Sequence, residues 1–105
     1  MKNSTKLLNK IISKLEEQGY SKYEKYYMFK LKEITSKNIE LIRKKGTVAK
    51  VPISTLEYTI NEYIKDDNLY DYGPSKLKEI GITHINSPVH SLLHLIPKSS
   101  YHESQ

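Results

Sequence analysis

The first twenty positions of the chain carry apolar residues at alternating three- and four-residue spacing. This spacing places them on one face of a helix, with polar residues on the opposite face. We therefore predict an amphipathic helix over residues 5–18, capped by Ser4 or Thr5 and closed by Gly19. The apolar positions that define its buried face are Leu7, Leu8, Ile11, Ile12 and Leu15.

A second apolar repeat follows in residues 21–45. Ser21 and Glu24 have the spacing of a capping box, in which each side chain satisfies the backbone amide of the other residue. Gly46 is a residue at which this helix can end. The pattern predicts one long helix from Ser21 to about Lys45, with Asn38 filling one position of its apolar face. The remaining positions of that face are Tyr23, Tyr27, Leu31, Ile34, Leu41 and Ile42.

The segment after Gly46 favours extended structure before helix resumes. Residues 47–53 are rich in β-branched side chains and contain Pro52, which suits a connector or an edge strand. Ser54 and Glu57 repeat the capping-box spacing and begin a predicted third helix that ends near residues 65–68. The pattern also allows one β element, a two-stranded ribbon in which residues 48–53 pair with residues 82–85.

The C-terminal part is less regular. A turn at Gly73 and Pro74 leads into a short helical segment that closes at Gly81. Ser87 and Pro88 form a cap and first-position pair for a last helix, which Pro97 stops. Residues 99–105 are predicted to be a polar, disordered C-terminal tail. The predicted fold class is mostly α: a small single-domain helical bundle over residues 1–98, with room for a short two-stranded β element.

Composition narrows the class of protein. A chain of 105 residues with 37% hydrophobic content fits one core, and the absence of cysteine excludes disulfides and thiolate sites. Residues 1–18 contain lysines among their apolar positions, which indicates neither a signal peptide nor a membrane span. We therefore expect a cytoplasmic protein without a membrane partner.

Charge is distributed unevenly. Residues 1–50 hold 13 Lys and Arg against five Asp and Glu, whereas residues 51–105 hold four against seven. A basic half favours a polyanionic partner, although two halves that attract each other are an alternative. Arg43 is the only arginine. Lysine attracts phosphate as a point charge, whereas base-specific contacts favour the planar guanidinium, so we expect little sequence preference.

Two segments concentrate candidate binding residues. Lysines recur every fourth residue along the first predicted helix, at Lys2, Lys6, Lys10 and Lys14, and form one stripe that either tracks phosphates or is simply a solvated face. Residues 19–32 interleave tyrosines with lysines, a combination that binds single-stranded nucleic acid by stacking and charge. On a helix Tyr26 and Phe29 lie off the apolar face and are free for a partner, whereas core packing is the competing interpretation.

His90 and His94 lie four residues apart on the predicted last helix and flank its apolar face. Such a pair binds zinc only with further ligands, for which His84, His102 and the nearby acidic residues are the candidates. The glutamate that a metalloprotease helix carries after its first histidine is absent. We predict boundary histidines that change charge on mild acidification, and no metal or other cofactor.

The sequence carries no recognised catalytic motif, and the prediction is a protein that is not an enzyme. We predict a small basic binding protein that contacts nucleic acid or a ribonucleoprotein surface. The alternatives are an accessory subunit, adaptor or inhibitor that docks on a larger protein complex, and a helix-turn-helix DNA-binding element over residues 37–65. The predicted nucleic-acid-binding residues are Lys6, Lys10, Lys14, Lys22, Lys25, Tyr26, Lys30, Arg43, Lys44 and Lys45.

Overall fold

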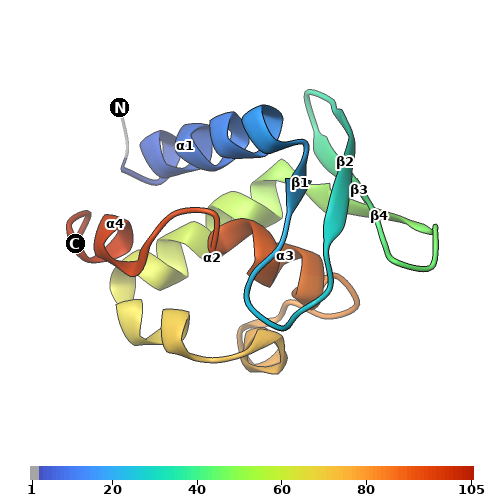
Figure 1. Ribbon diagram of the computed structural model, residues 1–105. Helices are drawn as coiled ribbons and strands as arrows, with labels where there is room; N and C mark the ends of the chain where they lie inside the picture. Colours follow the sequence, from blue (N-terminus) through green and yellow to red (C-terminus); the bar gives the residue numbers. More distant parts are fainter. Residues whose placement is uncertain (1–2) are drawn as a thin grey trace.

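The computed structural model describes residues 3–105 and has an α+β fold with a four-stranded antiparallel sheet (Figure 1). The prediction of a helical bundle with at most a two-stranded element is therefore wrong. Lys2 of the predicted lysine stripe lies outside the described residues. The elements in chain order are α1 (Asn3–Gln18), β1 (Tyr20–Ser21), β2 (Phe29–Ile34), β3 (Asn38–Ile42), β4 (Val48–Pro52), α2 (Ile53–Lys65), the 3-10 helices η1 (Asp67–Asp71) and η2 (Pro74–Ile80), α3 (Asn86–Leu93) and α4 (Lys98–His102).

The four strands pair in sequence order, each antiparallel to the next. One face of the sheet is buried in the core: its side chains are Phe29, Ile39, Leu41, Ala49 and Val51, all less than 5% exposed. Lys30 and Lys50 alternate with these residues and are exposed on the other face. Helices cover only the buried side, and the sheet projects from the helical part (Figure 1).

The long helix predicted over residues 21–45 is replaced by β1, β2 and β3. The helical pattern left Phe29 and Ile39 off its buried face, whereas period-two alternation turns both into the core at 4% and 0% exposure. Thr35 begins the turn between β2 and β3, because its Oγ1 accepts the backbone amides of Lys37 and Asn38 at 3.2 and 2.9 Å. Ser21 and Glu24 form no capping box, and Glu24 has a positive φ of 49°.

The predicted ribbon and helix-turn-helix are also wrong. β4 pairs with β3, with Val48 opposite Ile42 and Val51 opposite Ile39, and residues 82–85 form no strand. Because residues 38–52 are two strands of one sheet, residues 37–65 cannot form two helices joined by a turn. The prediction of extended structure over residues 47–53 is confirmed for Val48–Pro52, which form β4, whereas Ile53 begins α2.

The first and third predicted helices are confirmed as α1 and α2. Gly19 closes α1 with a φ of +79°, and its backbone amide donates to the Leu15 carbonyl at 2.7 Å. The start of α2 differs from the prediction, because Pro52 is its N-cap and no side chain caps the helix there. The Ser54 side chain is exposed.

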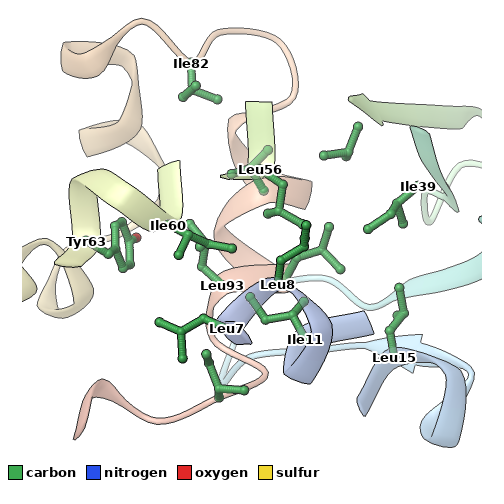
Figure 2. Close-up of a cluster of buried hydrophobic side chains, with 14 of the residues drawn as sticks. Leu7, Leu8, Ile11, Leu15, Ile39, Leu56, Ile60, Tyr63, Ile82 and Leu93 are labelled. Atoms are coloured by element: carbon green, nitrogen blue, oxygen red, sulfur yellow. The ribbon is translucent and has the colours of Figure 1, made fainter. Parts of the chain in front are cut away.

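The core lies where α1, α2 and α3 meet the buried face of the sheet. Figure 2 shows Leu8, Ile11 and Leu15 of α1 pointing toward Leu56 of α2 and Ile39 of β3. These five side chains are 0–6% exposed. Burying an aliphatic side chain of this size stabilises the folded state by about 1.5–3 kcal/mol. The sheet is therefore held against the helices by one continuous apolar cluster.

The C-terminal part packs onto this core through short helices. The predicted segment over 74–80 is the 3-10 helix η2, and α3 begins at Asn86 with no side-chain cap from Ser87. The predicted disordered tail is wrong, because Lys98–His102 form α4 and Tyr101 is completely buried. Within residues 3–105, no helix has the length and apolar character needed to cross a membrane.

Candidate nucleic-acid interface

Two loops leave the same end of the sheet, and residues of both line one hollow there. Residues 22–28 join β1 to β2, and residues 43–47 join β3 to β4. The strand register explains their proximity. Lys30 at the start of β2 pairs with Ile42 at the end of β3, so both loops begin next to the same pair of residues.

Backbone hydrogen bonds fix both loops. In the first loop the Tyr26 amide donates to the Tyr23 carbonyl at 3.0 Å. In the second, Arg43 donates to Thr47 and Gly46 donates to Arg43, both at 2.8 Å. Gly46 has a φ of +92°, a conformation that costs a residue with a side chain more than glycine.

The two loops enclose two adjoining hollows of about 510 and 640 Å³. They share Tyr27, Arg43 and Lys44 as lining residues, and we call them together the basic groove. Met28 and Ile42 add apolar surface to the first hollow, and Phe29 adds it to the second. Six cationic residues line the basic groove: Lys22, Lys25, Lys30, Arg43, Lys44 and Lys45.

Seven of the ten predicted binding residues therefore come together, these six and Tyr26. The other three lie on α1, away from the basic groove. Lys10 and Lys14 line a different hollow, of about 460 Å³, beside Pro97 and Ser100. Lys6 is exposed on α1 and lines none of these hollows. Folding gathers the cations of the two sheet loops and separates them from those of the first helix.

The cations of the basic groove keep their charge available. Within residues 3–105 none of the six forms an ion pair with a carboxylate, whereas three of the four later lysines do, namely Lys65, Lys76 and Lys98. The Lys22 ammonium donates to the backbone carbonyl of Glu24, and an Arg43 guanidinium nitrogen donates to the His84 carbonyl at 3.3 Å. These neutral acceptors position the side chains without cancelling their charge.

Tyr26 and Tyr27 exchange the roles that helical spacing predicts for them. Tyr27 is 65% exposed, and the Lys44 Nζ lies 4.9 Å from the centre of its ring. Tyr26 is half-buried, with its ring 5.1 Å from that of His90. A Cβ added at Gly73 would lie 2.8 Å from the Tyr26 hydroxyl oxygen, so this side chain is packed closely against the neighbouring backbone. Phe29, the other aromatic predicted to be free, is in the core.

The outer face of the sheet extends the floor of the basic groove. Lys30 pairs with Tyr20 on one side and Ile42 on the other, and Ile42 pairs with Val48. These four residues form one row across the sheet, because directly paired residues project to the same face. Tyr20 and Val48 are 42% and 40% exposed. The row places apolar and aromatic surface beside the Lys30 ammonium.

The paired histidines lie inside the protein, so the prediction of boundary histidines is wrong. His90 is 1% and His94 8% exposed, and their rings are 4.1 Å apart. We call the surrounding group the Tyr–His cluster. Its members are Tyr23, Tyr26, Tyr63, Tyr70, His90, His94 and Tyr101.

Backbone carbonyls bind both histidine rings. The His90 Nε2 lies 3.0 Å from the Tyr72 carbonyl oxygen. His94 has an oxygen near each nitrogen, with Nδ1 2.7 Å from the carbonyl of His90 and Nε2 2.8 Å from that of Tyr70. Burial and, secondarily, the neighbouring His94 lower the pKa of His90 to about 4. His90 is therefore neutral under mild acidification, contrary to the predicted change of charge.

The other two histidines do not join this pair. The His102 Nδ1 lies 3.0 Å from an Asp67 carboxylate oxygen at the surface, and His84 is exposed with a φ of 64°. Among residues 3–105 no three His, Asp or Glu side chains are arranged to hold a metal ion. The geometry of the Tyr–His cluster is that of packing and hydrogen bonding to the backbone.

Sequence reasoning missed lining residues of the basic groove, among them the more accessible apolar and aromatic ones Tyr27, Met28 and Ile42. All three are apolar or aromatic, and a helical pattern either buries them or leaves them unassigned. Alternation in β3 was the available signal, because it places Ile42 on the face opposite the buried Leu41. The direction of Tyr27 and Met28 depends on the loop, which no periodicity describes.

Comparison of the chain with protein-family models, with curated proteins and with solved structures finds no match.

Proposed function

We propose that this protein binds nucleic acid, free or within a ribonucleoprotein, through the basic groove, and that it acts by binding without catalysis. One observation carries the proposal: six cations that have no carboxylate partner within the described part of the chain line adjoining hollows at one end of the sheet. Binding a phosphate chain releases its condensed counterions, which supplies affinity that falls as the salt concentration rises. We expect the protein to act in the cytoplasm.

The distribution of ion pairs supports a polyanion over an internal role for these cations. Three acidic residues of the later half pair with lysines of the same half: Lys98 with Asp71 at 2.6 Å, Lys76 with Glu79 at 3.1 Å and Lys65 with Glu62 at 3.4 Å. In the first half Lys32 pairs with Glu40 at 3.7 Å, whereas the six cations of the basic groove have no carboxylate partner among residues 3–105 and are left for an external partner. A single arginine, Arg43, limits bidentate contacts to base edges, which favours binding with little sequence preference.

Two variants that each remove three positive charges test the proposal. The groove variant combines Lys25→Gln, Lys44→Gln and Lys45→Gln, and the helix variant combines Lys6→Gln, Lys10→Gln and Lys14→Gln. Affinity for a mixed-sequence oligonucleotide is measured by fluorescence anisotropy at salt concentrations from about 50 to about 200 mM. The groove variant is expected to bind more than about 10-fold more weakly and to lower the salt slope by about 2 to 3.

The helix variant is expected to keep nearly the wild-type affinity and salt slope. Equal losses in the two variants would show that net charge, rather than the groove, drives binding. Absence of wild-type binding to any oligonucleotide at low salt would refute the proposal and leave docking on a protein complex as the better candidate.

A further inference from the structure

Tyr27 stands apart from the other aromatic residues of the protein. At 65% exposure it is the most exposed of the large hydrophobic side chains described in residues 3–105. It belongs to the lining of both hollows of the basic groove, with the Lys44 ammonium beside its ring. Exposed aromatic area next to a cation is the arrangement on which a nucleobase stacks while its phosphate is neutralised.

The shape of the groove distinguishes an unpaired base from a duplex. Each hollow lies within the range of about 300–1,000 Å³ that accommodates small organic ligands, which suits one base with its sugar. In a duplex the base faces are stacked and only the edges are accessible, through a groove that a protruding helix or ribbon enters. A concave surface cannot make that approach, whereas a base turned out of a single strand can enter it.

The chemistry of the lining indicates how the base is held. Met28, 39% exposed, adds a flexible apolar side chain beside Tyr27, and Ile42 lies at the floor. Every base has a π face, so stacking on Tyr27 tolerates any sequence. Lys22, Lys25 and Lys30 lie in the same hollow, where they are placed to attract the flanking phosphates.

We propose that the basic groove selects single-stranded nucleic acid by holding an unpaired base against Tyr27 and Met28. This inference rests on the proposed function and adds its substrate class. A purely electrostatic site prefers the duplex, because its charge density is higher. Preference for a single strand is therefore the property that stacking adds.

The experiment compares three fluorescent probes of equal length: a mixed-sequence single strand, the corresponding duplex, and an abasic strand that keeps the phosphates but lacks bases. The wild-type protein is expected to bind the single strand most tightly. Tyr27→Ala is expected to weaken binding of the single strand by about 5- to 150-fold and to leave the abasic strand unchanged. Tyr27→Phe keeps the ring and is expected to keep the affinity.

Tyr72→Ala is the matched control. Tyr72 is 51% exposed and has the Lys76 Nζ 4.7 Å from its ring, but it lies outside the basic groove. The Tyr72→Ala variant is expected to bind all three probes as tightly as the wild type does. Duplex binding as tight as single-strand binding, or an equal loss on the abasic strand, would overturn the inference and leave the proposed function standing. No binding of any probe at low salt would overturn both.

Discussion

Tyr26 and Tyr27 are neighbours in the chain and both line the basic groove, yet their rings have opposite physical roles. Tyr26 packs into the Tyr–His cluster, where aromatic rings contact one another and backbone carbonyls accept the polar hydrogens. Tyr27 lines the basic groove, where its ring is largely exposed beside Lys44. The same residue type stabilises the fold in one region and is available to a partner in the other.

The two regions differ in whether their polar groups already have partners within the protein. In the Tyr–His cluster the Tyr101 hydroxyl donates to the Leu93 carbonyl at 2.5 Å, and the Tyr70 hydroxyl donates to the Ile96 carbonyl at 3.1 Å. Burial raises the pKa of Tyr101 well above its usual range, so this hydroxyl remains a donor. In the basic groove the charged groups have no carboxylate partner among the described residues. The first region contributes to stability, and the second is the region that we propose binds a partner.

The largest expected difference between the regions is in stability. Tyr101→Ala removes a completely buried aromatic ring and should lower the free energy of unfolding by about 3–5 kcal/mol. Tyr27→Ala removes an exposed ring and should change it by less than about 0.5 kcal/mol. Urea unfolding followed by circular dichroism measures both. Similar losses for the two variants would contradict the division into a packing region and a binding region.

A second comparison uses pH. The pKa of His90 is about 4 in the folded protein and near the ordinary 6.5 when unfolded, so the unfolded chain binds the proton more tightly. The stability that neutral His90 contributes is complete above about pH 6.5 and falls by up to about 3 kcal/mol as the pH drops to 4. The measurement is the urea midpoint of wild type and His90→Gln over this range.

The His90→Gln variant should lose stability less steeply with falling pH than the wild type does. His84→Gln is the control, because His84 is exposed, and it should retain the wild-type pH dependence. If wild type and His90→Gln show the same slope between pH 6.5 and 4, neutral His90 does not contribute as described.

The smallest predicted effect separates two buried tyrosines within the Tyr–His cluster. The Tyr63 hydroxyl is buried and has no hydrogen-bond partner among residues 3–105, whereas that of Tyr101 has one. Tyr63→Phe should therefore raise the free energy of unfolding by about 1 kcal/mol, and Tyr101→Phe should lower it by a similar amount. Differential scanning calorimetry would give the two shifts, and shifts of the same sign would disagree with this assignment of partners.

Sequence patterns predicted the helices better than the sheet, for a physical reason. In α1 every large apolar residue falls on one helical face, so only one period fits. In residues 27–42 the apolar positions fit a helical face except for Met28, Phe29 and Ile39. The last two are buried in the sheet and follow the two-residue period of strands. The polar turn at Thr35 and Asn38 was not recognised from the sequence, because Asn38 was assigned to one position of the predicted helical face.

The candidate site was predicted in composition but not in arrangement. Six cations of the basic groove were identified from charge alone, but charge does not say that Lys25 and Lys44 meet while Lys10 lies elsewhere. That separation depends on strand register, which brings two loops to one end of the sheet. The direction of Tyr27 is set by an irregular loop, so spacing rules assigned the free ring to its neighbour.

The junction at Pro52 has a mechanical consequence for the basic groove. β4 passes into α2 without an intervening loop, and the amide of Ile53, the first helical residue, donates to the Lys37 carbonyl at 2.8 Å. This junction therefore anchors the sheet to α2, and we expect the width of the groove to change mainly through its two loops. A ligand would meet a largely preorganised surface, so little ordering entropy opposes its binding.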